Sequence, residues 1–403
     1  MTIDDYQVLQ RNLDGNAQVT LDNGEQIMLP TGGPHTVGGA KEVLVGDLWV
    51  LAGQSNMEGV GDLADVETPS AQVHSYQSRE QWAVAEEPLH WLGESPRLVH
   101  HKLGGRETVP DEIDSRDMGR TKGAGLGLTF GKERVSRTGV PVGLIPAAHG
   151  GTSMTQWNPG LKGKGGASLY GATLERVRAN GGKAAGILWY QGESDCDSEA
   201  LALYPARMTA LVQAFRADLG QPDLPFLCVQ IGCVVADPDP HGIDGWNGIR
   251  EAQRVWAQAQ ANVSMVSAID LGLDDSIHIS TPDLKRLGRR LADAADGVAA
   301  PAVRGATLEN DGPRVRVRFD HVRGGLVSLG RPAGFSLRTA SGQEMVRIYK
   351  TTLEGSDAVL HLTEALPPDA ELWYGWGFNP YCNITDGQDA AMPAFGPVPL
   401  SQG

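Results

Sequence analysis

Apolar runs alternate with helix-like stretches between residues 43 and 300. The runs predict strands at Val43–Leu51, Val140–Ala147, Ala185–Tyr190, Pro225–Ile231 and Ser264–Asp270. The stretches between them predict helices near Gly125–Arg137, Ser168–Asn180, Glu199–Leu219 and Trp246–Gln260. A closing helix is predicted to begin at Thr281, with Pro282 in its first turn. Such alternation is typical of a mostly parallel sheet covered by helices on both faces, whose ligands bind beyond the carboxyl ends of the strands.

The two ends of the chain show a β pattern instead. Near the start, Gln18–Leu21 and Gln26–Leu29 flank Asn23-Gly24, which predicts a hairpin that must pack on another part of the chain. Arg314–Phe319 alternates strictly, so its apolar residues share one strand face, with the arginines on a solvated face. Short strands are predicted to follow at Phe335–Arg338, Val346–Lys350, Ala358–Leu362 and Glu371–Tyr374.

These patterns predict three domains. Residues 1–42 form an N-terminal β segment, residues 43–300 an α/β domain, and residues 301–403 a small all-β domain resembling a sandwich. The polar, weakly periodic stretch 62–120 is interpreted as an insertion after the first strand that roofs the site.

Composition narrows the possible partners. The net charge is −15 in 403 residues, which disfavours nucleic acids and strongly anionic membranes and fits a neutral or weakly charged substrate. The four cysteines lack the spacing of a metal site or a disulfide framework. No leader sequence and no apolar run of about 20 residues is visible, so we expect a cytoplasmic protein, or an exported one if a leader was trimmed.

Polar residues follow three of the predicted strands. Ser55 comes directly after the first strand and Gly53, where its hydroxyl can act as a nucleophile and its N–H can face an oxyanion. Gly150 and Gly151 follow the second strand and let a backbone N–H approach a ligand closely. Gln191 follows the third strand, and its amide is a neutral donor for an oxyanion.

A fourth block follows the last predicted strand of the sheet and contains Asp275 and His278. In Asp-x-x-His on a tight loop, the carboxylate can accept the imidazole N–H and fix the tautomer, which leaves the other ring nitrogen for Ser55. Asp274 is the alternative acid.

The four blocks, in this order, resemble those of the SGNH hydrolases, in the carbohydrate-esterase branch that includes sialate O-acetylesterases and acetylxylan esterases. Gly53–Met57 reads Gly-Gln-Ser-Asn-Met, Gly150–Thr152 reads Gly-Gly-Thr, and Trp189–Glu193 reads Trp-Tyr-Gln-Gly-Glu. The resemblance implies a flavodoxin-like three-layer α/β/α fold with a mostly parallel five-stranded sheet. It also implies a triad of Ser55, His278 and Asp275, with an oxyanion hole made by Ser55, by Gly150 or Gly151, and by Gln191.

The resemblance implies removal of O-acetyl groups from carbohydrates. Neither a metal nor another cofactor is expected, because His100-His101 lacks a third ligand at a recognisable spacing and the chain has no His-Glu-x-x-His. Two alternatives remain open: a general short-chain carboxylesterase, and a non-catalytic carbohydrate-binding protein with a vestigial esterase core. The sequence leaves open the acetylated sugar and the oligomeric state. Residues predicted to support the site or bind substrate are Gln54, Asn56, Glu193, Arg250, Trp157 and Trp246, although the two tryptophans can equally be core residues.

Overall fold

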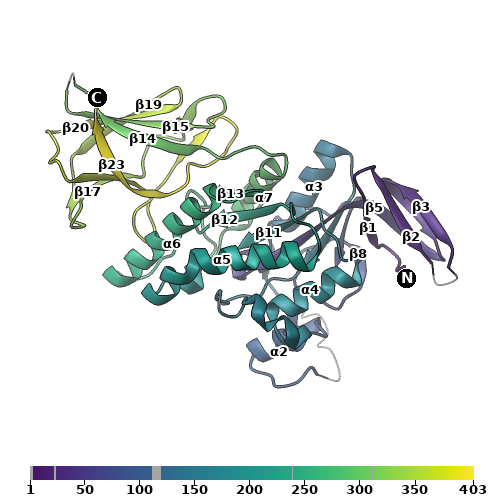
Figure 1. Ribbon diagram of the computed structural model, residues 1–403. Coiled ribbons are helices and arrows are strands. Elements are labelled where there is room, and N and C mark those ends of the chain that lie inside the picture. Colours follow the sequence, from purple (N-terminus) through teal and green to yellow (C-terminus); the bar gives the residue numbers. More distant parts are fainter. Residues whose placement is uncertain (1–2, 22–23, 111–118, 238, 311) are drawn as a thin grey trace. The chain divides into compact units, whose positions relative to one another are not determined.

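The computed structural model describes residues 3–21, 24–110, 119–237, 239–310 and 312–403 (Figure 1). Contacts divide the chain into two compact units. The first comprises Met1–Ser194, Ala206–Leu227 and His278–Ala295, and the second comprises Asp195–Pro205, Cys228–Ile277 and Asp296–Gly403. Each unit is described by itself, and the predicted domain boundaries remain predictions.

The sheet of the first unit is built around β5 (Ala40–Gly53). Its strands follow the order β11-β5-β10-β7-β8, with β11 (Gly186–Tyr190), β10 (Val142–Pro146) and β7 (Val73–Tyr76) parallel to their neighbours and β8 (Trp82–Val84) antiparallel to β7. Beyond β11, the Ile187 N–H donates to Pro225 O just before β12 (Phe226–Gln230). The mostly parallel sheet predicted from the apolar runs is therefore confirmed.

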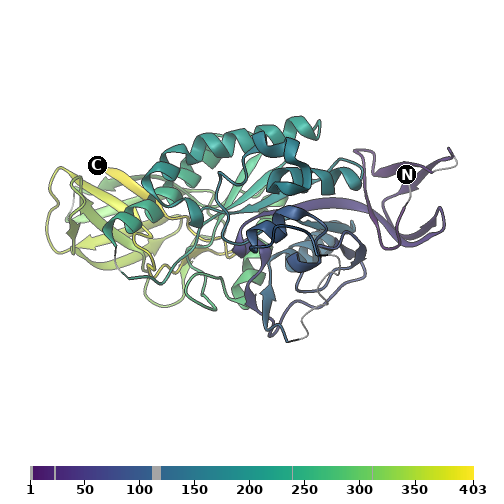
Figure 2. The same ribbon diagram turned by 90° about the horizontal axis from the view of Figure 1, so that it is seen from below.

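Helices cover both faces of this sheet. In Figures 1 and 2, α3 (Gly127–Thr138) and α7 (Thr281–Ala295) lie on one face, and α4 (Leu169–Ala179) lies on the other with the part of α5 (Ser198–Asp218) that belongs to this unit. Gly131 of α3 leaves room for Val73 and Val142, because a β-carbon there would lie 2.8 Å from Val73 Cγ1. The three-layer α/β/α arrangement is therefore confirmed.

The N-terminal segment packs on the first half of β5. Here β1 (Val8–Gln10) runs parallel to β5, β4 (Gly32–Val37) runs antiparallel to it, and β2 (Asn16–Thr20) pairs with β3 (Gln26–Pro30) as the predicted hairpin. Of the predicted turn, Asp22 and Asn23 lie outside the described residues. Val43 and Val45 of β5 join the apolar core of this segment, so one long strand links the N-terminal segment to the central sheet.

The stretch predicted as an insertion also extends the sheet, which has more than the five strands expected. It contributes β7 and β8, and also contains β6 (Gly61–Asp62) and α2 (Leu98–Leu103); β6 pairs with β9 (Lys122–Ala124). Apolar periodicity does not reveal β7, since two of its four buried residues, His74 and Ser75, are polar.

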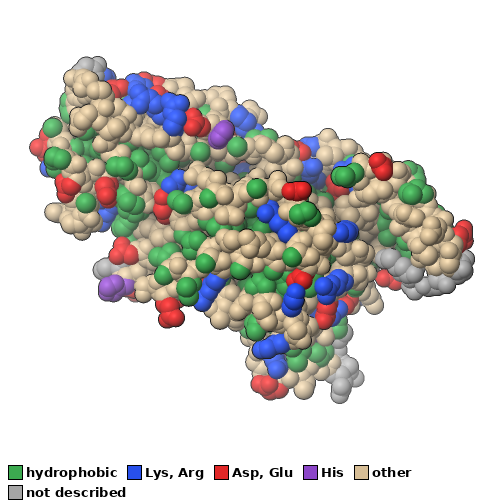
Figure 3. All heavy atoms as spheres, in the orientation of Figure 1, with side chains coloured by type: hydrophobic (Ala, Val, Ile, Leu, Met, Phe, Trp, Pro, Cys, Tyr) green, Lys and Arg blue, Asp and Glu red, His purple; other side chains and the backbone are tan. Residues whose placement is uncertain are grey.

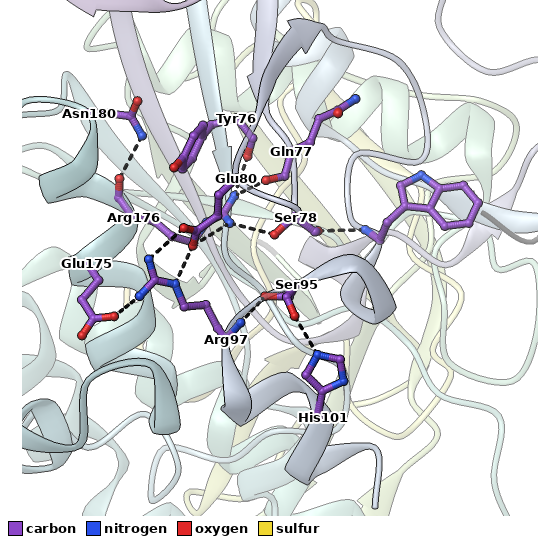
Figure 4. Close-up of polar contacts among 11 residues, drawn as sticks. Tyr76, Gln77, Ser78, Glu80, Ser95, Arg97, His101, Glu175, Arg176 and Asn180 are labelled. Carbon is purple, nitrogen blue, oxygen red and sulfur yellow. Dashed lines mark hydrogen bonds and ion pairs between the residues drawn. The ribbon is translucent and has the colours of Figure 1, made fainter. Parts of the chain in front are cut away.

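Two arginines, Arg97 in this stretch and Arg176 in α4, link the stretch to α4 (Figure 4). Arg97 pairs with Glu80, at 2.5 Å from Nε to Oε1, and with Glu175 of α4. Arg176 of α4 is fully buried and donates to the carbonyls of Tyr76, Gln77 and Ser78 at the end of β7. Charge-assisted hydrogen bonds, those of Arg176 buried and those of Arg97 partly exposed, thus hold the residues before α2 in place.

The second unit holds the C-terminal all-β domain. Its eight-stranded sheet has the order β18-β17-β21-β23-β14-β15-β20-β19, and a small separate sheet pairs β16 with β22. The strands are β14 (Ala302–Leu308), β15 (Arg314–Asp320), β16 (Leu326–Ser328), β17 (Phe335–Thr339), β18 (Glu344–Met345), β19 (Ile348–Glu354), β20 (Asp357–Leu362), β21 (Ala370–Tyr374), β22 (Ile384–Asp386) and β23 (Phe395–Gln402). The same unit contains α6 (Pro240–Gln258), β13 (Val263–Ser267) and the remainder of β12.

The arginine stripe of β15 lies as predicted. Val315, Val317 and Phe319 are buried in the core of the β domain. On the opposite face, Arg316 pairs with Glu309 at 2.7 Å and Glu354 at 2.9 Å, and Lys and Arg side chains gather over β15 in Figure 3. Among the described residues, no helix is both long and apolar enough to span a bilayer.

Candidate active site

Three strand ends meet at one edge of the sheet in the first unit. Tyr190 at the end of β11 is in register with Gly53, and Pro146 at the end of β10 is in register with Leu51. Beyond the strands, the Gln54 N–H donates to Tyr190 O at 2.8 Å and the His149 N–H donates to Gly53 O at 3.1 Å. The first three polar blocks therefore emerge side by side.

Gly53 permits the sharp turn that delivers the serine. Its φ is +135°, and a β-carbon there would lie 2.1 Å from Tyr190 O, so only glycine fits between the two strands. The short helix α1 (Ser55–Glu58) begins two residues later. Ser55, its first residue, is buried, with 9% of its surface exposed.

Asn56 joins α1 to two other segments of the site. Its Nδ2 donates to Glu193 Oε1 at 3.0 Å, and its Oδ1 accepts the backbone N–H of Ile279, also at 3.0 Å. The amide of Gln54 fits best with its nitrogen toward Glu193 Oε2, at 3.2 Å. The predicted supporting residues Gln54, Asn56 and Glu193 thus form one network, which extends to the residue after His278.

The predicted oxyanion donors lie in different surroundings. A β-carbon on Gly150 would lie 3.4 Å from Ser55 Cβ, so this glycine adjoins the serine. Its N–H donates to Glu58 Oε2 at 2.7 Å. Gly151 is exposed, with a φ of +66°. Gln191 is fully buried, and its Nε2 donates to Thr152 O at 3.1 Å.

The division between the two units falls between Asp275 and His278. In the first unit His278 is half-buried and immediately precedes the Ile279 N–H that Asn56 accepts. In the second unit Asp275 is exposed, and its Oδ1 accepts the Ile277 N–H at 3.0 Å, while Asp274 is half-buried. The choice of triad acid, and its bond to His278, remain predictions.

Three buried histidines adjoin the second block, and the sequence patterns did not assign them a role. Nδ1 of His149 lies 3.0 Å from Nδ1 of His100, with the rings stacked 5.2 Å apart. Nε2 of His90 accepts the Ala148 N–H at 3.2 Å. Burial lowers the pKa of His90 to about 3 and that of His149 to about 4, and it holds the pKa of His100 well below its usual value. The signal available in the sequence was the position of His149 at a strand end.

Two buried carboxyl groups, those of Glu58 and Glu87, have raised pKa values. Burial raises the pKa of Glu58 to about 7, against the hydrogen bond from Gly150 and the attraction of Arg120. Burial also raises the pKa of Glu87 to about 7. A carboxyl group with such a pKa changes its charge near neutral pH, and groups with perturbed pKa values are enriched at functional sites.

Trp157, Trp246 and Arg250 are all buried. For the two tryptophans this favours a role in core packing over substrate binding. Trp157 is fully buried edge-on to Trp189, and its Nε1 donates to Thr152 Oγ1. In the second unit, Trp246 is 6% exposed and donates to Gly232 O. Arg250 there is 1% exposed, because its guanidinium donates to the backbone carbonyls of Ile231, Gly232, Gly375, Gly377 and Phe378. Substrate contact by these three side chains is not supported.

Within the described ranges, no three His, Cys, Asp or Glu side chains are arranged to hold a metal ion. The site contains a buried serine with backbone N–H groups, side-chain amides and imidazoles around it.

Residues 45–296 match the family model of the carbohydrate esterases described as sialic acid-specific acetylesterases. The chain belongs to this family. It is a carbohydrate acetylesterase, a carboxylic ester hydrolase. The matched residues contain all four blocks.

The chain is similar to two further proteins, one in sequence and one in fold. The esterase is 29% identical over 270 residues to the Arabidopsis thaliana protein called probable carbohydrate esterase At4g34215, covering 61% of this chain and 89% of that one. It also resembles the crystal structure of XAC1771, a carbohydrate acetylesterase from Xanthomonas citri, with a TM-score of 0.70, 23% identity and 97% coverage of both chains. At that identity the second likeness supports the fold, including the C-terminal β domain.

Proposed function

We propose that this esterase removes O-acetyl groups from sugars through an acetyl-enzyme on Ser55. The observation that carries the proposal is the junction of three strand ends, which brings Ser55 next to Gly150 and anchors α1 to the residue after His278. A buried serine with a backbone N–H and an imidazole-bearing loop at hand has the parts that acyl transfer needs.

In the first step, the Ser55 oxygen attacks the acetyl carbonyl carbon while His278 takes the hydroxyl proton. The oxyanion is received by N–H groups of Ser55 and of Gly150 or Gly151, with the Gln191 amide as a further donor. The carbon–oxygen bond to the sugar then breaks, and His278 returns the proton to the departing sugar oxygen. Water repeats the sequence on the acetyl-enzyme and releases acetate. Asp275, with Asp274 as the alternative, orients the imidazole.

The substrate is proposed to be a neutral or weakly charged acetylated oligosaccharide. The net charge of −15 supports this class over polyanionic glycans. Acetylated sialic acid and acetylated xylo-oligosaccharides are the two candidates that follow from the family's name and from the motifs. Cytoplasmic action on imported oligosaccharides is the accompanying proposal for its location.

The test is acetate release from a panel of acetylated sialic acid, xylo-, manno- and xyloglucan oligosaccharides, alongside nitrophenyl esters of increasing chain length. Wild type is compared with Ser55→Ala and with Ser153→Ala, a half-buried serine beside the second block whose hydroxyl bonds to Gln156. We expect acetate release to vanish only in Ser55→Ala, and the wild type to gain the mass of one acetyl group when quenched during turnover. Activity retained in Ser55→Ala would contradict the serine mechanism. A preference for long acyl chains over acetylated sugars would instead support a general carboxylesterase.

A further inference from the structure

The carboxyl group of Glu58 lies against the nucleophile and an oxyanion donor at once. Glu58 is the last residue of α1, one helical turn after Ser55. Its Oε2 accepts the Gly150 N–H at 2.7 Å. A β-carbon on Gly150 would lie 3.3 Å from this same oxygen and 3.4 Å from Ser55 Cβ, so the three residues are in contact.

This contact conflicts with catalysis when Glu58 is ionised. The N–H of Gly150, a proposed donor to the oxyanion, is already used by the carboxylate. A negative charge at this place also repels the charge that develops on the substrate oxygen, and such repulsion is strong where water is largely excluded. A neutral acid lacks the repulsion, and it can turn its own O–H toward the oxyanion.

Resting on the proposed function, we propose that Glu58 is a positioning residue that gates the oxyanion hole through its charge: its carboxylate holds the Gly150 N–H strongly and repels the oxyanion, and its neutral form accepts that N–H more weakly and leaves the site competent. Burial supports the gate, because it brings the pKa of Glu58 to about 7 and so puts both forms within reach of ordinary conditions.

The charged and titratable groups around Glu58 leave its pKa at about 7. Arg120 is the cation that favours its ionised form. The ring of His90 contacts the Glu58 backbone and is neutral near pH 7, since its pKa is about 3. Four other titratable residues lie nearby. Glu87 adjoins Gly125, and His149 precedes Gly150. Glu193 bonds to Asn56 of α1, and His278 precedes Ile279, whose N–H donates to Asn56.

The test compares Glu58→Gln with wild type. The glutamine side chain has the size of glutamate but carries no charge at any pH, and its amide oxygen accepts the Gly150 N–H more weakly than a carboxylate does, so the oxyanion can displace it. Glu86→Gln is the matched control, since it makes the same charge change at an exposed position of the neighbouring loop. The readout is kcat/KM for the best acetyl ester between pH 5 and 9, together with the rate at which a fluorophosphonate labels Ser55.

If only protonated Glu58 is competent, wild-type kcat/KM falls tenfold per pH unit above the pKa, or by about 100-fold at pH 9. We expect this alkaline fall in the wild type and in Glu86→Gln, and a level profile to pH 9 in Glu58→Gln. Below neutral pH the three profiles are expected to be the same. The fluorophosphonate labelling rate should follow the same three profiles.

Two outcomes overturn the gate: the same alkaline fall in Glu58→Gln as in wild type, or low activity of a correctly folded Glu58→Gln at every pH, which means that the carboxylate itself is needed. Failure of the serine mechanism gives a different result. In that case Ser55 takes up no fluorophosphonate in any variant and Ser55→Ala keeps its turnover.

Discussion

The hydrogen bond from Asn56 to Glu193 can be tested by exchanging the amide and the carboxylate between the two side chains. Replacing Asn56 by Asp keeps an oxygen for the Ile279 N–H, but it sets a second carboxylate oxygen against Glu193 Oε1, which lies 3.0 Å from Asn56 Nδ2 in the wild type. Two like charges about 4 Å apart in partly buried surroundings repel by about 4 kcal/mol before any relaxation. We therefore expect Asn56→Asp to lower the free energy of unfolding by about 2–4 kcal/mol.

The same change should impair turnover, because Ile279 follows His278. A displacement of about 1 Å in a catalytic group costs about 10²-fold in rate, so kcat should fall by that order with a smaller change in KM. Acetate release and urea unfolding of the same preparations measure the two effects.

The decisive variant combines Asn56→Asp with Glu193→Gln. Glu193 accepts at both oxygens, from Asn56 and from the amide nitrogen of Gln54. Glu193→Gln alone therefore turns one donor toward another donor, whereas in the double variant the new amide donates to the new carboxylate and still accepts from Gln54.

We expect the double variant to recover most of the stability and turnover that Asn56→Asp loses, with a coupling of about 2–3 kcal/mol in the double-mutant cycle. If the losses of stability and turnover in the two single variants simply add in the double variant, the reasoning is refuted, because the Asn56–Glu193 hydrogen bond then does not stabilise α1.

Two further predictions concern the backbone and the buried imidazoles. At Gly53 φ is +135° and a β-carbon would lie 2.1 Å from Tyr190 O, so Gly53→Ala should lower the free energy of unfolding by about 3 kcal/mol or more and turnover by at least 10²-fold. The control Gly163→Ala, whose β-carbon would meet open space, should change neither quantity. Wild-type stability of Gly53→Ala in urea would contradict the turn geometry. Since burial lowers the pKa of His90 from 6.5 to about 3, its stabilising contribution is complete above pH 6.5 and is lost as the pH falls toward 3, by about 1.4 kcal/mol per unit. His90→Asn should therefore flatten the fall in stability between pH 6.5 and 4.5, and an unchanged slope would mean that this imidazole is not the group being protonated.

Much of the fold follows from local apolar runs. The five strands predicted for the sheet are all present. Four of them, β5, β10, β11 and β12, contain runs of at least five consecutive buried residues, which a continuous apolar pattern can predict. The start of α6 was predicted at Trp246 but lies at Pro240. Gly242 and Gly245 weaken the helical pattern there, and the signal that outweighs them is the Asp239 side chain, which accepts the Gly242 N–H at 3.1 Å.

The strand β7 could not be predicted because its stability depends on distant residues. His74 is buried there, with Nδ1 2.6 Å from Tyr6 O, a partner 68 residues away. Neither β-propensity nor apolar alternation reports such a contact. The same applies to Glu58, whose partner Gly150 is 92 residues away. Motif spacing identified the candidate nucleophile, but it could not indicate that a carboxyl group would accept the N–H of Gly150, a predicted oxyanion donor.

These long-range contacts share one element, which explains why the blocks need one another. Within its four residues, α1 presents Ser55 to the site, Asn56 to the third block and to the residue after His278, and Glu58 to the loop of the second block. Met57 is 1% exposed and packs into the core. A helix of one turn has little stability of its own in water. Its geometry, and with it the direction of the serine, is therefore set by the three segments that it contacts, so that a change in any one of the blocks is expected to act on the nucleophile through α1.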